Sequence, residues 1–544
     1  MTVAPAAKGV DLRRAHLPAD DSAVLIDLTV GQVLAQRAVS HADKPALIGV
    51  RHDGSPARLT YAELHGEAVR VATALTATAD RGSYVALWAP NVVEWSVIQY
   101  GAALAGMVLV ALNPALTAEE LEYALRHSGA SVLIHADTHR DDDMAGVAAG
   151  VAEKLPALLR ISLSERGRWQ AAEPNPGVAA DAPTSADDPV MLQYTSGTTG
   201  RPKGVLLTHR SLVNVAKLTM EASEVKHGSV CLNPLPMFHT AGCVVATLGP
   251  LWLGGTVVLV ERFRPAPVLD ALRREQASVL FYVPAMLGAL LETQRNASVS
   301  APALTVIMGG ASSVPPVMIE EAEEVFGASV LNLFGQTELG PVLSATRPSD
   351  SRRDQLTTVG RPLPQVECKI VDPASGETVA IGEPGEICAR GYQQFLEYLH
   401  DPDATARTVD ADGFVHTGDL GTLDERGYLT VTGRLKDLII RGGENISPAE
   451  IEAVVAAHHA VADVAVVGIP DDRWGEIVAA VITIRADAAI PDELDIADHV
   501  ATRLAAFKVP ARWYVAESLP VTPTGKVRKF ALRDAIDAGD LREI

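Results

Sequence analysis

The stretch from Thr60 to Val110 reads TYAELHGEAVRVATALTATADRGSYVALWAPNVVEWSVIQYGAALAGMVLV, and its alternating pattern decides the fold class. TYAELHGEAVRVATAL and VVEWSVIQYGAALAGM have the apolar spacing of helices, whereas YVALW between them is typical of a buried strand. The same rhythm returns at SVLIHA, SVCLNPL, GGTVVLV, SVLFYV and TVIMGG. Short apolar strands that alternate with helices indicate parallel sheets covered on both faces. We therefore expect an α/β body built on parallel-type sheets.

The pattern changes twice toward the C-terminus. Beyond Thr357, the Gly-rich segments VECKIVD, GEICARG, GFVHTGD and GYLTVTG predict antiparallel hairpins in a small β-barrel-like subdomain or distorted sheet. Beyond Arg434, SPAEIEAVVAAH, VADVAVVGI, EIVAAVITIR and DELDIADHVATRLAAF predict a separate α+β unit. The expected fold is therefore α/β and α+β multidomain. Its large N-terminal domain spans 1–434 and its C-terminal domain 435–544, with the boundary near Leu435–Lys436.

Length and composition support this division. A chain of 544 residues exceeds one ordinary domain, and 48% hydrophobic with 21% charged residues is the balance of a globular protein. The formal net charge of -21 disfavours nucleic acid and anionic membrane surfaces as partners, because polyanions would be repelled over most of the surface. We therefore expect no nucleic-acid partner.

Cysteine use and apolar runs predict a cytoplasmic protein. Its four cysteines lie in apolar runs without a C-x-x-C pair, which indicates reduced core thiols rather than a zinc site. The N-terminus has no apolar segment typical of a signal peptide. Ala241–Val260 is long enough for a bilayer, but Pro250 and Gly254-Gly255 interrupt it. It therefore predicts a buried core segment and no transmembrane span.

A loop rich in hydroxyls and glycines follows the apolar run PVMLQY. From Tyr194 to Gly204 it reads YTSGTTGRPKG, with Lys203 as its last cation. Backbone amides and hydroxyls in such a loop can donate to a polyphosphate, and glycines let the backbone approach it. The spacing differs from the Walker A pattern. On composition alone, a polar turn without a ligand remains the alternative.

Four more strings accompany this loop, and together they resemble a known family. They are NLFGQTE (332–338), HTGD (416–419), TGRLKD (432–437) and PTGKVRK (523–529). With the loop, they resemble the signatures of the adenylate-forming (ANL) superfamily, of the acyl-CoA synthetase or fatty-acid and aryl-acid CoA ligase type. The resemblance covers essentially the whole chain, from LTYAEL to PTGKVRK, with the motifs in order.

This resemblance implies ATP, Mg²⁺ and coenzyme A as cofactors. It assigns catalytic roles to Lys526, Glu338, Thr337 and His239, with Glu338 and Thr195 as ligands of the metal. The chemistry of these side chains is suitable: a carboxylate is a hard oxygen ligand, and a compact lysine can stabilise charge during displacement at phosphorus. The resemblance also implies that the C-terminal domain is mobile, with a hinge at 435–437.

The same resemblance implies the cofactor-binding residues. Phe334 offers a stacking face for adenine, although the family more often has Tyr there. Asp419 has two acceptor oxygens for the ribose diol, and Arg434 reaches the same sugar. The implied set is Thr195, Ser196, Gly197, Thr198, Thr199, Gly200, Lys203, Gly310, Ala311, Asn332, Phe334, Gly335, Gln336, Asp419, Arg434, Lys436, Gly442, Gly443 and Trp474.

The predicted acid pocket is apolar. PLPMFHTAG (234–242) resembles the acyl-pocket motif of CoA ligases, with His239 where amino-acid adenylation domains have Asp. YVPAM (282–286) and GGA (309–311) continue the implied wall without a charge. A pocket without a counter-ion favours a neutral hydrophobic acid over an amino acid. Fatty, aryl and alicyclic acids all stay open.

The second half-reaction has its own implied residues. RGGEN (441–445) resembles the glycine-rich loop of the pantetheine tunnel, and Trp474 is expected to pack against that arm. Phe507, Lys508 and Arg512 are candidates for the CoA nucleotide. One departure from the family lies in GYQQFLEYL (391–399), where EYL replaces the common GYW pattern.

The expected function is ATP-dependent activation of a hydrophobic carboxylic acid to acyl-AMP, followed by thioester formation with CoA. Three alternatives stay open: loading of an acyl carrier protein, catalysis of only one half-reaction, and a catalytically silent nucleotide-binding scaffold. The expected partners are the acid, ATP and CoA, with a homodimer also left open.

Overall fold

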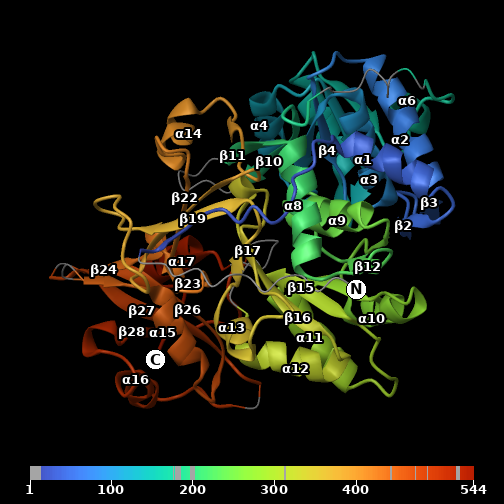
Figure 1. Ribbon diagram of the computed structural model, residues 1–544. Helices are drawn as coiled ribbons and strands as arrows, with labels where there is room; N and C mark the ends of the chain where they lie inside the picture. The colour runs from blue at the N-terminus through green and yellow to red at the C-terminus, as the bar shows by residue number, and fades with distance from the viewer. Residues whose placement is uncertain are drawn as a thin grey trace. The chain divides into compact units, whose positions relative to one another are not determined.

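The computed structural model describes residues 14–175, 177, 185–195, 202–310, 314–441, 444–471, 473–486, 488–521 and 527–544. The chain divides into two compact units. Unit 1 comprises Met1–Leu17, Cys368–Cys388 and His416–Ile544, and unit 2 comprises Pro18–Glu367 and Ala389–Val415. Figure 1 shows the elements of both units.

Unit 2 contains a seven-stranded sheet among its described residues. Its order is β21 (Glu397–Tyr398), β11 (Lys203–Thr208), β10 (Pro189–Thr195), β5 (Val108–Leu112), β4 (Tyr84–Trp88), β6 (Val132–His135) and β9 (Leu159–Ser162). The strands from β10 to β9 are parallel, whereas β11 is antiparallel to both of its neighbours. The central strands are apolar on both faces, as expected for a parallel sheet between helices.

A nine-stranded sheet forms the second layer of unit 2 in the described chain. Its order is β18 (Arg361–Pro362), β17 (Ser344–Ala345), β16 (Ser329–Phe334), β15 (Val306–Gly310), β14 (Val279–Tyr282), β12 (Val230–Asn233), β13 (Thr256–Leu259), β2 (Pro45–Val50) and β3 (Pro56–Thr60). All pairings from β16 to β2 are parallel. Their carboxyl ends therefore meet at one edge, where ligands of such sheets commonly bind.

Helices fill the space between these two sheets. They are α1 (Val30–Ser40), α2 (Tyr61–Thr76), α3 (Val93–Ala105), α8 (His209–Ala222) and α9 (Ala246–Trp252), and they are visible in Figure 1. The helix α3 contacts β4 and β5 of one sheet and β2 of the other, and all of its residues are buried. A helix that is apolar all round is expected in such a middle layer. Side-chain capping also fixes the start of α2, because Thr60 and Glu63 form a capping box.

The outer faces of the two sheets carry further helices. The first sheet contacts α4 (Ala118–Ser128) and α5 (Met144–Glu153). The apolar residues of α10 (Pro265–Arg274), α11 (Pro284–Arg295) and α12 (Pro316–Phe326) share one core with the second sheet. Smaller elements complete unit 2: α6 (Arg166–Trp169), α13 (Arg352–Thr357), α14 (Pro402–Thr408), β7 (Thr138–His139) and β8 (Asp142–Asp143).

Unit 1 contains most of a five-stranded sheet in the described residues. Its order is β1 (His16–Leu17), β19 (Val366–Val371), β20 (Gly385–Gly391), β22 (Val415–Leu423) and β23 (Leu429–Arg434). The pairs β1–β19 and β22–β23 are antiparallel. Strands β19, β20, β22 and β23 contain the Gly-rich segments for which the sequence predicts antiparallel hairpins.

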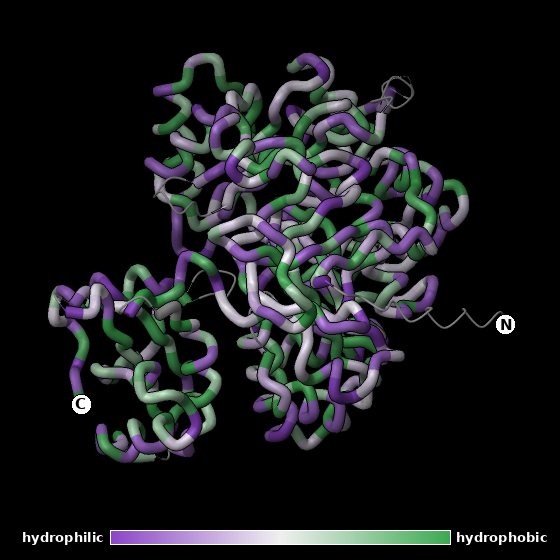
Figure 2. The backbone as a smooth tube through the Cα atoms, turned by 60° about the vertical axis from the view of Figure 1, so that its left-hand side comes forward, coloured by the Kyte–Doolittle hydropathy of each residue, from purple (hydrophilic) through white to green (hydrophobic). Residues whose placement is uncertain are grey.

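The C-terminal part of unit 1 is an α+β sandwich. The sheet comprises β24 (Ile439–Arg441), β25 (Glu444–Ile446), β26 (Val461–Asp471), β27 (Gly475–Ile484), β28 (Arg512–Val515) and β29 (Arg542–Glu543). The helices α15 (Pro448–Ala456) and α16 (Glu493–Ala501) share one apolar core with it, and α17 (Lys529–Ala538) shares another. Figure 2 shows hydrophobic (green) stretches recurring along the backbone near the C-terminus.

The multidomain α/β and α+β fold expected from the sequence is confirmed. YVALW forms β4, and the apolar runs from SVLIHA to TVIMGG form β6, β12, β13, β14 and β15. The segment Ala241–Val260 divides into a π-helical turn (η1, Ala241–Val245), α9 and β13, and it is buried. Among the described residues, no helix combines the length and apolar character needed to cross a membrane. The boundary at 434/435 stays a prediction, and 435–437 forms a short 3-10 helix, η3 (Leu435–Asp437), within unit 1.

Candidate active site

The nucleotide motif lies at the carboxyl edge of the nine-stranded sheet. Strand β16 ends at Phe334, and the 3-10 helix η2 (Thr337–Leu339) follows. Neighbouring β15 ends at Gly310, which pairs with Leu333, while Gly309 pairs with Asn332. A Cβ on Gly310 would lie 2.1 Å from the carbonyl oxygen of Leu333, so only glycine fits this close approach.

The acid motif leaves the same edge of the same sheet. PLPMFHTAG follows β12, and VPAM follows β14, which is the parallel neighbour of both β12 and β15. The predicted acid and nucleotide segments therefore emerge from adjacent strands on one side of the sheet. His239 is half-buried here, and its Nδ1 accepts a hydrogen bond from the Ala241 amide at 3.2 Å.

Close backbone contacts fix the turn around His239. A Cβ on Gly242 would lie 2.2 Å from the carbonyl oxygen of Pro236, which explains why glycine occupies that position. The side chain of Asn233 donates to the Gly242 carbonyl at 3.1 Å and accepts from the Leu235 amide at 3.0 Å. These buried hydrogen bonds hold the turn against the end of β12.

Glu338 is buried and has a specific partner. Its Oε1 accepts a hydrogen bond from the Tyr398 hydroxyl at 2.7 Å, and only 9% of Glu338 is exposed. Burial, and then the charge of Glu338, raise the pKa of Tyr398, so its hydroxyl stays protonated and donates. Lys203 Nζ lies 4.4 Å from the centroid of the Tyr398 ring. Thr195 lies directly opposite Lys203 across β10 and β11, so both residues are at the same end of these two strands.

Helix α4 holds both flanks of the predicted phosphate loop. The Tyr194 hydroxyl donates to the Ala124 carbonyl at 2.9 Å, and the Tyr123 hydroxyl donates to the Pro202 carbonyl at 3.0 Å. His127 Nδ1 lies 3.1 Å from the Tyr194 hydroxyl, and burial lowers the pKa of His127. The loop residues Ser196, Gly197, Thr198, Thr199 and Gly200 lie outside the described residues, as does Ala311.

The two predicted ribose residues form an ion pair within unit 1. Asp419 and Arg434 are directly opposite each other on β22 and β23, and Arg434 Nε lies 2.9 Å from Asp419 Oδ1. Asp419 is 4% exposed. An arginine beside a buried carboxylate orients that carboxylate through a charge-assisted hydrogen bond.

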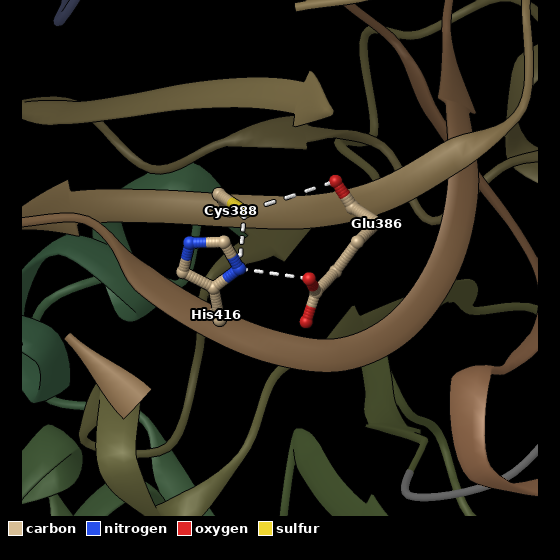
Figure 3. Close-up of side chains that lie close together, drawn as sticks. All are labelled: Glu386, Cys388 and His416. Atoms are coloured by element: carbon tan, nitrogen blue, oxygen red, sulfur yellow. Dashed lines mark hydrogen bonds and ion pairs between the residues drawn. The ribbon is translucent and has the colours of Figure 1, made fainter. Parts of the chain in front are cut away.

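A cluster that the motifs do not predict precedes Asp419. Figure 3 shows Glu386 and Cys388 on β20 facing His416 on β22. Glu386 Oε2 lies 2.7 Å from His416 Nδ1, and Cys388 Sγ lies 3.5 Å from the same nitrogen. All four cysteines are buried and form no disulfide, as expected for core thiols.

The predicted CoA residues lie on exposed parts of unit 1. Trp474 is 41% exposed, and the guanidinium carbons of Arg441 and Arg473 lie 5.6 and 4.8 Å from its ring centroid. Arg441 also donates to the Phe507 carbonyl at 2.6 Å. Neither motif analysis nor resemblance identifies Arg473, although its position beside Trp474 in the sequence is a usable signal.

The other predicted cations form ion pairs, are exposed, or lie outside the described residues. Lys508 forms an ion pair with Glu450 at 2.6 Å, and Arg512 forms one with Glu543. Lys436 is exposed in η3. Gly442, Gly443 and Lys526 lie outside the described residues.

A cavity of about 620 Å³ opens elsewhere in unit 2, between the β2–β3 hairpin and α10. Its wall includes Ile48, Val260 and Ala271. Its lining contains none of the predicted site residues that the structure describes, so it is distinct from the predicted acid pocket.

Comparison with known proteins identifies related enzymes. The model of the AMP-binding enzyme family matches residues 34–399, and that of the AMP-binding enzyme C-terminal domain matches residues 450–526. The chain is 37% identical to a feruloyl-CoA synthase of Amycolatopsis sp, over 90% of this chain and 96% of that protein. It is 32% identical to the mitochondrial medium-chain acyl-CoA ligase ACSF2 of Rattus norvegicus, over 94% and 88% of the two chains. The crystal structure of ATP-bound MatB from Rhodopseudomonas palustris matches with a TM-score of 0.81 and 30% identity, over 93% of this chain and 99% of that chain.

Proposed function

This chain belongs to the AMP-binding enzyme family, and we propose that it is an AMP-forming acyl-CoA synthetase acting on a hydrophobic carboxylic acid. The observation that carries this proposal is the shared sheet edge. The acid motif after β12 and the nucleotide motif after β16 emerge on one side of one parallel sheet, with β14 and β15 between them. A carboxylate and an ATP α-phosphate can therefore be held next to each other.

The reaction proceeds in two displacements. A carboxylate oxygen attacks the α-phosphorus of ATP, and the bond to the leaving pyrophosphate breaks, which gives acyl-AMP. The CoA thiol, losing its proton, then attacks the acyl carbon, and AMP leaves with the bond electrons. Each step relies mainly on positioning and on stabilising transferred negative charge.

The polar group around Glu338 suits the polyphosphate. Glu338 and Thr195 present hard oxygen donors of the kind that Mg²⁺ prefers, and the buried carboxylate of Glu338 is already oriented by Tyr398. We assign both residues to the metal, which would neutralise phosphate charge when bound. Lys203 adds a positive charge near the same ring, and Thr337 contributes a hydroxyl toward the α-phosphate.

The nucleoside part of ATP falls to other residues. Phe334, at the end of β16, offers a stacking face for adenine, and Asn332, Gly335 and Gln336 flank it. Asp419, held by Arg434, is assigned to the ribose hydroxyls. His239 is assigned to the carboxylate entry of the acid pocket.

The thioester step uses the exposed residues of unit 1. Trp474 is assigned to the pantetheine arm, and Arg441 and Arg473, which flank its ring, are available for CoA phosphates. Lys508 and Arg512 stay candidates for the CoA nucleotide, but each would first exchange a carboxylate partner for a phosphate. Lys526 serves adenylation. Lys436 lies at the hinge, and rotation there replaces Lys526 at the active site with the tunnel loop that contains Gly442 and Gly443.

The uncharged segments around the acid site support a neutral, hydrophobic substrate. The two relatives carry the names of a feruloyl-CoA synthase and a medium-chain acyl-CoA ligase, so they support both aryl and aliphatic acids. A cytoplasmic location is supported by four buried cysteines that form no disulfide. A homodimer is a further proposal, which light scattering of the purified protein tests.

The function is tested by mass-spectrometric detection of products from ATP and a panel of fatty, aryl and alicyclic acids. Assays run without acceptor, with CoA, and with a phosphopantetheinylated acyl carrier protein. We expect acyl-AMP without an acceptor and acyl-CoA with CoA. A thioester formed only on the carrier protein would show that this protein, and not CoA, is the acceptor. Acyl-AMP as the sole product would limit the enzyme to one half-reaction. Absence of any product would favour a silent scaffold.

A further inference from the structure

Residues His416–Gly418 lie in β22 just before its pairing with β23 begins at Asp419, and the positive φ of Gly418 turns the backbone there. This His416–Gly418 turn is hydrogen-bonded to consecutive residues of strand β20. His416 Nδ1 lies 2.7 Å from Glu386 Oε2, and the Gly418 amide donates to Glu386 Oε1 at 2.9 Å. Between them, the Thr417 hydroxyl donates to the Ile387 carbonyl at 2.7 Å. One carboxylate therefore spans the two ends of the turn.

The buried position of Glu386 makes these contacts strong. Glu386 is 6% exposed, and each of its oxygens has a donor. A buried carboxylate that loses its donors would be costly, so the side chain and the turn hold each other in place. Gly418 has a φ of 69°, in the left-handed region, which aims its amide in this way without a Cβ penalty.

The turn sets the position of Asp419. The Asp419 amide donates to the Thr417 hydroxyl at 3.1 Å, and the carboxylate of Asp419 meets Arg434 at 2.9 Å. The backbone of Asp419 is thus fixed through β20, whereas its side chain is oriented from β23. Loss of either support would let the carboxylate move relative to a bound sugar.

The cluster in Figure 3 offers oxygen, sulfur and nitrogen atoms of the kinds that bind transition metals, but its geometry favours a hydrogen bond. Bonds from zinc to oxygen and nitrogen are about 2.0–2.1 Å, so two tetrahedral ligand atoms lie about 3.3 Å apart. The separation of 2.7 Å between Glu386 Oε2 and His416 Nδ1 is that of a direct charge-assisted hydrogen bond.

We propose that Glu386 is a positioning residue for ribose recognition: it holds the His416–Gly418 turn and thereby places the Asp419 carboxylate for the sugar hydroxyls. This inference rests on the proposed function, in which Asp419 binds the ribose of ATP. Glu386 acts through the turn and does not itself contact the nucleotide.

The test compares kcat/KM for ATP, 2′-deoxy-ATP and 3′-deoxy-ATP in acyl-AMP formation. Wild type should prefer ATP, and Asp419→Asn should lose that preference. Glu386→Ala should lower it roughly tenfold or more, and Glu386→Gln, which keeps an acceptor but loses the charge, roughly threefold or more. Loss of preference is the informative readout, because a general loss of stability would reduce activity with all three nucleotides equally.

Two controls sharpen the comparison. Glu425 is an exposed carboxylate in the turn between β22 and β23. The variants Glu425→Gln and Glu425→Ala should keep the wild-type preference for ATP over its deoxy analogues. In an Asp419→Asn background, Glu386→Gln should change the preference no further, because both residues act on the same contact.

The outcomes separate the two claims. Unchanged preference in Glu386→Gln, with Asp419→Asn altered as expected, overturns the role of Glu386 even if Glu386→Ala does not fold. An unchanged preference in Asp419→Asn removes the ribose contact on which the inference depends and overturns it as well. Absence of acyl-AMP from wild type with every acid would instead reject the proposed function.

Discussion

The buried carboxylate of Glu338 depends on a hydroxyl that lies 60 residues away in the sequence. The Tyr398 hydroxyl donates to it at 2.7 Å, inside the segment where EYL replaces the common GYW pattern. That departure changes the neighbours of Tyr398 but leaves its hydroxyl in contact with Glu338. The hydrogen bond orients an acidic side chain that would otherwise sample several rotamers.

We predict that Tyr398→Phe lowers kcat/KM for ATP in acyl-AMP formation roughly tenfold, because a hydrogen bond to a charged group is lost. Pyrophosphate release measures this change. The control is Tyr392→Phe, since the buried Tyr392 hydroxyl has no hydrogen-bond partner in the described part of the chain. Equal activity of the two variants would contradict the role of Tyr398.

Trp474 gives a prediction for the second half-reaction. Trp474→Ala should raise the KM for CoA roughly tenfold and leave acyl-AMP formation without CoA unchanged, because the exposed ring is proposed to contact the pantetheine arm, which takes no part in adenylation. Leu494→Ala, an exposed apolar position in the same unit, is the control. A matching loss in the adenylation step would show that Trp474 supports the fold rather than CoA.

At the scale of elements, a buried histidine links two helices of the middle layer. His209 is the first residue of α8, and its Nδ1 accepts a hydrogen bond from the amide of Val30, the first residue of α1, at 3.2 Å. Burial lowers the pKa of His209 to about 4. The neutral ring is therefore the form that fits between the helices.

This depressed pKa predicts a pH dependence of stability. The unfolded chain takes up the proton near pH 6.5, so the contribution of the neutral His209 ring to the free energy of unfolding is complete above that pH. It is lost as the pH falls toward 4 and amounts to about 3 kcal/mol. Urea midpoints at pH 7.5 and 5.0 should therefore differ more for wild type than for His209→Gln. His459→Gln is the surface control. An identical pH dependence of the urea midpoint in wild type and His209→Gln would contradict the prediction.

Elements with strong local patterns could be predicted from the sequence, whereas long-range contacts could not. YVALW forms β4 because it is a short, uninterrupted apolar run of the kind found in buried parallel strands, and the capped segment from Thr60 forms α2. The contact between Glu386 and His416 depends on which strands pair, across 30 residues. Likewise, Tyr123 reaches Pro202 only because α4 packs beside the first sheet. Motifs identify residues that touch ligands, but their supporting partners follow from the register of the fold.

For the molecule as a whole, we propose that the C-terminal domain serves both steps in turn. In the proposed function, Lys526 serves adenylation, while the tunnel loop and Trp474 serve thioester formation. We predict that Lys526→Ala suppresses acyl-AMP formation at least a hundredfold, since it removes a charge that stabilises the displaced phosphate. Thioester formation from synthetic acyl-AMP should change little. Equal losses in both steps, measured by product quantification, would reject this division of labour.

Activation through acyl-AMP can be followed by labelling the carboxyl oxygens of the acid. The carboxylate attacks the α-phosphorus, and the thiol later breaks the bond between the acyl carbon and that same oxygen. An acid labelled with ¹⁸O in both carboxyl oxygens should therefore transfer one ¹⁸O to AMP for each acyl-CoA formed, as read by mass spectrometry of the AMP. AMP without label, or label in pyrophosphate or inorganic phosphate, would contradict activation through acyl-AMP.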